Sequence, residues 1–174
     1  MKGLSPVRKI LGIEIKRNRR EGIISLNKKS YALKILKRFT MSNAKSVSLP
    51  FANHFKLSND QSPKTEEEFK RMTKVPYSNA VGSVMYLMIC SRLDLAFAIS
   101  VLSRYMSNPG EALWEAMKWL LRYIKGTCDL GIEYRKQSEG VILRGYTDSD
   151  YAGNRDNRKS TSAYVYILCN SCIN

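Results

Sequence analysis

The stretch GIEYR at residues 131–135 decides the fold class, because it returns the chain to a strand pattern after a long run of helical pattern. Two further strands are predicted after it, at Val141–Thr147 and Ser162–Leu168. Before the helical run, residues 10–16 (ILGIEIK) alternate apolar and polar side chains as a half-buried strand does. The order of strands, helices and strands predicts an α+β fold in which a second sheet begins near residue 130.

The N-terminal strands are predicted to form a hairpin with a basic turn. Ile10–Lys16 and Ile23–Leu26 are its strands, and RNRREG at residues 17–22 connects them. Asn27 is predicted to cap a helix whose apolar stripe consists of Ala32, Ile35, Leu36 and Phe39. The other face of this helix carries Lys34, Lys37 and Arg38. Ordinary solvation explains that face, but its nearness to the basic turn favours a surface that faces phosphates.

The middle of the chain is predicted to be helical after a loop. Ser46–Lys64 has little periodicity and contains two prolines, which indicates a loop or linker. Helices are predicted from Lys64 to about Lys74, at Ala80–Cys90, at Asp94–Met106, and from a cap at Asn108 to Gly126. Their Met and Trp residues are interpreted as core.

Charge points to a polyanionic partner. The chain has 174 residues, enough for one globular domain or two small ones, and a formal net charge of +14. Residues 1–76 hold 18 of the 29 Lys and Arg and 6 of the 15 Asp and Glu. Nucleic acid is the commonest partner of such a surface, while an anionic membrane surface and plain solvation stay open. We expect an intracellular protein, because neither a secretion signal nor a membrane span is apparent.

Two acidic residues in GYTDSD (residues 145–150) are the sharpest chemical feature. Two-metal phosphodiester chemistry needs several carboxylates around cations roughly 4 Å apart, and Asp148 and Asp150 supply two of them. The local pattern by itself favours a turn. Cys169 and Cys172 have the spacing of half a zinc site, but the only histidine, His54, is far away in the sequence. No P-loop, dinucleotide fingerprint or nucleophile elbow occurs.

Five ordered segments carry a family resemblance. They are MKGLSP with ILGIEI (residues 1–6 and 10–15), YSNAVGSVMYL (77–87), LSRYMSNP (102–109), YIKGT (123–127), and GYTDSDYAG with RKSTS (145–153 and 158–162). Together they resemble the end of the reverse transcriptase and the start of the ribonuclease H domain of copia-type retrotransposon Pol polyproteins. The chain departs from that pattern at Gly3, Leu93 and Ala163, where the family usually has Asp, Pro and Gly.

The resemblance implies a division into four regions. Residues 1–45 would end the palm and thumb-like part of the reverse transcriptase, and 46–76 would be a linker with a short polar helix. Residues 77–128 would be a helical connection, and 129–174 a truncated ribonuclease H-like sheet. The expected partner is an RNA–DNA hybrid or another nucleic acid, with no membrane, and the remaining polyprotein segments are further partners. A cytoplasmic particle or the nucleus is the expected location.

The resemblance also implies site residues. Asp148 would be the first of four ribonuclease H acids, which bind magnesium in the intact family; Asp150 receives no metal. Leu11 and Gly12 would support the 3′ end of the primer. The residues expected to contact nucleic acid are Leu11, Gly12, Lys16, Arg17, Arg19, Arg20, Lys28, Lys29, Lys34, Lys37 and Arg38.

The resemblance predicts a fragment that binds nucleic acid but has neither a complete polymerase site nor a complete ribonuclease H site. In the family, the polymerase Asp pair would precede Met1 and the other ribonuclease H acids would follow Asn174. We therefore expect this chain alone to bind no magnesium and to lack activity. Two alternatives stay open: a stand-alone basic nucleic-acid-binding module, and part of an active RNA-directed DNA polymerase and ribonuclease H.

Overall fold

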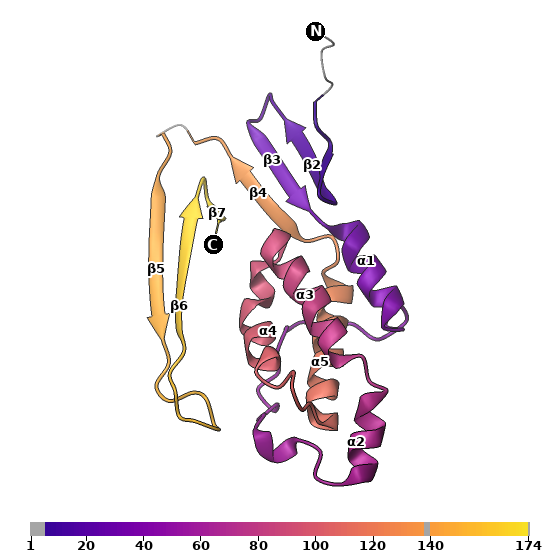
Figure 1. Ribbon diagram of the computed structural model, residues 1–174. Coiled ribbons are helices and arrows are strands. Elements are labelled where there is room, and N and C mark those ends of the chain that lie inside the picture. The colour runs from indigo at the N-terminus through magenta and orange to yellow at the C-terminus, as the bar shows by residue number, and fades with distance from the viewer. Residues whose placement is uncertain (1–5, 138–139, 174) are drawn as a thin grey trace.

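The computed structural model describes residues 6–137 and 140–173 (Figure 1). The first five residues of the matching N-terminal segment, Gly3 among them, lie outside the described residues. Over the described part, five α-helices and two antiparallel sheets form a mixed α+β fold, as predicted. Every helix in this part is too short or too polar to cross a membrane.

The first sheet joins the N-terminal hairpin to a strand from beyond the helices. It consists of β1 (Lys9–Ile10), β2 (Ile13–Asn18), β3 (Ile23–Asn27) and β4 (Gly131–Arg135), in that order. The expectation that a second sheet begins near residue 130 is therefore wrong, because β4 pairs with β3. A Cβ at Gly131 would lie 2.7 Å from Asn27 Cβ, so glycine permits this close approach.

A turn interrupts the strand that was expected at Ile10–Lys16. Ile10 pairs with Ile13, and the two residues between them have positive φ, 47° at Leu11 and 78° at Gly12. Positive φ at both central residues is the requirement of a type I′ turn, one of the common two-residue hairpin turns. Apolar alternation continues through Leu11, and for that reason the sequence pattern alone did not reveal the turn.

Helices build the core of the protein. They are α1 (Lys29–Arg38), α2 (Glu66–Thr73), α3 (Tyr77–Ser91), α4 (Ala96–Ser103) and α5 (Glu111–Gly126), with short 3-10 turns η1 (Asn59–Gln61) and η2 (Leu93–Leu95). The core side chains come chiefly from α1, α3, α4 and α5. Met117 is fully buried, and Met88 and Trp114 pack against the core, as expected. The interpretation is wrong for Met85 and Met106, which are 36% and 37% exposed.

Several helix boundaries differ from the prediction: α3 begins at Tyr77 instead of Ala80, and α4 spans Ala96–Ser103 instead of Asp94–Met106. The residue before α5 is Gly110, not Asn108, because the chain passes so close to Gln61 that a Cβ at position 110 would lie 2.9 Å from its carbonyl carbon. At the start of α1, Lys28 occupies the cap position, and the Asn27 side chain instead accepts a hydrogen bond from the Lys29 backbone N–H at 3.2 Å.

The charged pair that interrupts the apolar middle region ties α3 to α5. Arg92 is 2% exposed, and its guanidinium donates two hydrogen bonds to Asp94 at 2.7 and 2.9 Å. It also donates to the Thr127 carbonyl at 2.8 Å. The Tyr123 hydroxyl donates to Asp94 as well, at 3.0 Å. Arg92 therefore satisfies a backbone carbonyl just after the end of α5 while its charge is paired.

The second sheet lies beside the helical core (Figure 1). Its strands are β5 (Leu143–Ser149), β6 (Ser162–Leu168) and β7 (Ser171–Cys172), in that order. All β5 side chains and most β6 side chains are exposed. At one end, the Ser171 hydroxyl donates to the Glu133 carbonyl of β4. At the other end, the loop from residue 150 to 161 contacts the helical core.

Candidate nucleic-acid interface

Exposed basic side chains cover the N-terminal hairpin and helix α1. They are Lys16, Arg17, Arg19, Arg20, Lys29, Lys34, Lys37 and Arg38, all from the predicted set. Among the described residues, none of these eight forms an ion pair within 4 Å. We refer to this surface as the basic face. Its charges are solvated and unpaired with carboxylates, as contacts with phosphates require.

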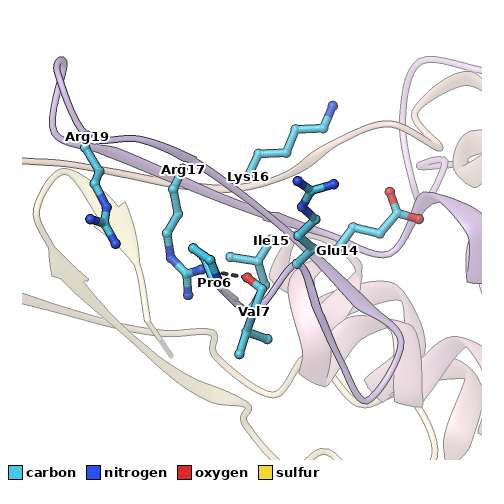
Figure 2. A pocket seen from close by; sticks show the side chains of 8 residues that line it. Pro6, Val7, Glu14, Ile15, Lys16, Arg17 and Arg19 are labelled. Atoms are coloured by element: carbon cyan, nitrogen blue, oxygen red, sulfur yellow. Dashed lines mark hydrogen bonds between the residues drawn. The ribbon is translucent and has the colours of Figure 1, made fainter. Parts of the chain in front are cut away.

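A cavity of about 560 Å³ opens beside β2. Its lining residues are Pro6, Val7, Arg8, Glu14, Ile15, Lys16, Arg17 and Arg19. Figure 2 shows Arg17 and Arg19 extending to the same side of the strand, with Lys16 on the other side, as strand alternation requires. Arg17 Nη1 donates to the Val7 carbonyl at 2.6 Å, which holds the segment before β1 against the hairpin.

Arg8 also belongs to this cavity, although it was not among the individual residues predicted to contact nucleic acid. Its position just before the alternating stretch gave no separate signal. The hydrogen bond from the Ile15 N–H to the Arg8 carbonyl, at 2.8 Å, brings it next to the basic residues of β2. Three guanidinium groups therefore line one cavity, and guanidinium is well suited to bind phosphate oxygens.

The hairpin and helix α1 are held together by a polar contact. The Ser30 hydroxyl donates to Glu14 Oε1 at 2.5 Å. Glu14 lies in β2 and Ser30 in the first turn of α1. This contact links the two parts of the basic face.

Leu11 and Gly12 lie at the tip of the turn between β1 and β2. Leu11 has a positive φ, which is uncommon for a leucine, and 81% of its surface is exposed. The Tyr86 hydroxyl of α3 donates to the Leu11 carbonyl at 3.2 Å. The predicted primer-supporting pair is thus presented to solvent at one corner of the first sheet.

The structure separates Lys28 from the other predicted contacts, because its side chain is only 2% exposed. Its ammonium lies 3.6 Å from the centroid of the Tyr86 ring and 5.2 Å from that of Tyr31. Burial lowers the pKa of Lys28, but interactions with the Tyr86 hydroxyl and the Cys90 thiol raise it by more, so the pKa lies above its usual value. Lys28 therefore stays charged at neutral pH and contacts aromatic rings.

Asp148 is an exposed residue of β5 whose carboxylate accepts a hydrogen bond from the Ser149 N–H at 2.9 Å. Asp150 follows the strand, and its Oδ1 accepts from the Thr161 N–H at 2.6 Å. The Asp150 N–H donates to the Thr161 carbonyl at 3.0 Å, so Asp150 closes the loop between β5 and β6. Within residues 6–137 and 140–173, no three His, Cys, Asp or Glu side chains gather into a metal-binding group.

Comparison with known proteins finds transposon polyproteins. The chain is 47% identical over 173 residues to the retrovirus-related Pol polyprotein from transposon TNT 1-94 of Nicotiana tabacum, covering 99% of this chain and 13% of that protein. It is 37% identical over 158 residues to that from transposon RE2 of Arabidopsis thaliana, covering 91% and 10%. The uncharacterized mitochondrial protein AtMg00810 of Arabidopsis thaliana is 32% identical over 171 residues, covering 98% and 67%. No family model and no solved structure matches the chain.

Proposed function

Because the chain belongs to the family of retrovirus-related Pol polyproteins of copia-type transposons, we propose that it binds the RNA–DNA template–primer duplex of reverse transcription. It would contribute the end of the reverse transcriptase and the start of the ribonuclease H domain. The chain spans 13% of the length of the tobacco polyprotein, so activities of the whole polyprotein enter only as proposals.

The basic face is the observation that supports this proposal. Eight exposed basic residues of the hairpin and helix α1 form a surface that is rich in cations, and the hydrogen bond between Ser30 and Glu14 links its two parts. A duplex presents phosphates along both strands, and each cation that replaces a condensed counterion adds affinity. Such contacts carry no sequence information, which suits a protein that must hold any template.

Asp148 would supply one acid of the ribonuclease H site. Its exposed position on a strand with open faces leaves room for further carboxylates from other polyprotein segments. One carboxylate alone does not hold two magnesium ions, so we propose that this chain binds a hybrid without cleaving it. Hybrid cleavage that needs magnesium and is lost in Asp148→Asn would refute this part.

The test neutralises part of the basic face and measures the salt dependence of binding. Fluorescence anisotropy with a labelled RNA–DNA hybrid is followed from 50 to 200 mM salt for the wild type and for Lys16→Gln/Arg19→Gln/Arg20→Gln. Because each of the three substitutions removes one cation from the phosphates, the slope of log K against log salt becomes shallower by about 2.7.

The matched control removes the same charge elsewhere. Lys64→Gln/Lys70→Gln/Lys74→Gln lies in and beside α2, at the opposite end of the molecule from the hairpin (Figure 1). The control is expected to keep the wild-type slope, and equal slopes for the two triple variants would contradict the proposal. Duplex DNA as a second ligand separates template–primer binding from the alternative of a general basic module, which binds both duplexes alike.

A further inference from the structure

We propose that Tyr86 and Lys28 form a latch that positions the Leu11–Gly12 turn for nucleic acid, so that Tyr86 of helix α3 is a positioning residue of the interface. This inference rests on the proposed function. The latch consists of the Lys28 ammonium, the Tyr86 ring, and the hydrogen bond from the Tyr86 hydroxyl to the Leu11 carbonyl. It links residues 75 positions apart in the sequence.

The turn needs support from outside itself. Leucine adopts positive φ less readily than asparagine or glycine, yet Leu11 has φ 47° with 81% of its surface exposed. Its own side chain therefore provides little packing that could hold this conformation. The Tyr86 hydroxyl binds the Leu11 carbonyl, so the support comes from the helical core.

The position of the Tyr86 ring is itself fixed from two directions. The Lys28 ammonium lies 3.6 Å from its centroid, and the Tyr31 ring meets it edge-on at 5.2 Å and 82°. Lys28 also lies next to Gly12, since a Cβ there would be 3.9 Å from its Nζ. One buried cation therefore contacts the tyrosine that holds the turn and lies beside the turn itself.

The charge of Lys28 strengthens the contact that Tyr86 makes. A cation over the ring draws electron density from the phenol and makes its hydroxyl hydrogen a better donor. That hydrogen is directed at the Leu11 carbonyl. The latch thus keeps Leu11 extended as an apolar tip at the edge of the basic face, where it can contact a sugar or a base edge.

The experiment compares two single hydroxyl deletions. Tyr86→Phe keeps the ring and its contact with Lys28 but removes the hydrogen bond to the turn. The control, Tyr31→Phe, removes the hydroxyl that donates to the Ser83 carbonyl at 3.4 Å and leaves the turn alone. We expect Tyr86→Phe to weaken hybrid binding about fivefold at an unchanged salt slope, and Tyr31→Phe to bind as the wild type does.

A double-mutant cycle with Leu11→Ala excludes a merely structural effect. If Tyr86 acts through the tip, Leu11→Ala/Tyr86→Phe binds no more weakly than Leu11→Ala alone. Additive losses, or equal affinities for Tyr86→Phe and Tyr31→Phe, would overturn the proposal. A wild type that binds no hybrid refutes the proposed function. Amide exchange at Ile13, which pairs with Ile10 across the turn and is expected to exchange faster in Tyr86→Phe than in Tyr31→Phe, then decides whether the latch exists.

Discussion

The contact between Asp156 and Tyr105 joins the second sheet to the helical core, and its removal has a calculable cost. The Tyr105 hydroxyl donates to Asp156 Oδ2 at 2.9 Å, and the Asn59 backbone N–H donates to Oδ1 at 2.8 Å. Hydrogen bonds to charged groups contribute roughly 1.5–3 kcal/mol each, and the exposure of Asp156 favours the lower value. We expect Asp156→Ala to lower the free energy of unfolding by about 3 kcal/mol.

Tyr105→Phe isolates one of these two bonds. Tyr105→Phe is expected to lower the free energy of unfolding by about 1.5 kcal/mol. The double variant Tyr105→Phe/Asp156→Ala should show a coupling energy of about 1.5 kcal/mol between the two positions. Urea denaturation followed by circular dichroism gives all four free energies by linear extrapolation. A coupling energy below about 0.3 kcal/mol would refute the assignment of this bond as a stabilising contact.

The same pair gives a pH dependence with a defined sign. Burial, followed by the hydrogen bond to Asp156 and its charge, raises the pKa of Tyr105 from 10.0 to about 12. Because the folded pKa is the higher one, this stabilisation is complete below pH 10 and is lost as the pH rises through 12. Tyr105→Phe should lack this part of the alkaline destabilisation.

Three further variants test other contacts. Gly110→Ala is expected to lower the free energy of unfolding by about 2 kcal/mol in urea titrations, because its Cβ would collide with the Gln61 carbonyl; an unchanged midpoint would contradict this. Lys28→Met should lower the free energy of unfolding by about 2 kcal/mol at neutral pH. Because the pKa of Lys28 is raised in the folded protein, the wild type should lose stability above pH 10.5, and Lys28→Met should not; unfolding at a series of pH values measures both. Asp148→Asn keeps an oxygen that can accept from the Ser149 N–H, so it should leave stability and hybrid affinity within about 0.5 kcal/mol, and a larger change by anisotropy or melting would contradict this.

Local patterns predicted several elements correctly. Gly131–Arg135 and Ser162–Leu168 have the predicted bounds, and the polar helix expected near residues 64–74 is α2, Glu66–Thr73. These segments have a clear period or a strong capping signal: Thr65 and Glu68 form the capping box that starts α2. Such signals depend only on residues that are close in the sequence, so the elements they predict can be recognised without knowledge of the tertiary structure.

Features that depend on distant contacts were not predictable. The pairing of β4 with β3 depends on where the helices place residue 131, and the burial of Lys28 depends on Tyr86 and Cys90 of α3. Most of the basic face was predictable, because exposed lysines and arginines follow the polar side of a helix and a turn. The roles of Asp148 and of the basic face in catalysis and binding stay predictions.

The pairing of β3 with β4 has a consequence for the order in which the chain folds. Asn27 pairs with Gly131, about 100 residues later in the sequence. Pairing β3 with β4 therefore closes a loop of about 100 residues, and the entropy of closing it costs roughly 4 kcal/mol. The helices between them form from local contacts and fold sooner. Until residue 135 has left the ribosome, β3 has an unpaired edge that could associate with other chains. Charged residues that flank such a strand in the sequence oppose association, so Lys28 and Lys29, which follow β3 directly, would protect the nascent chain.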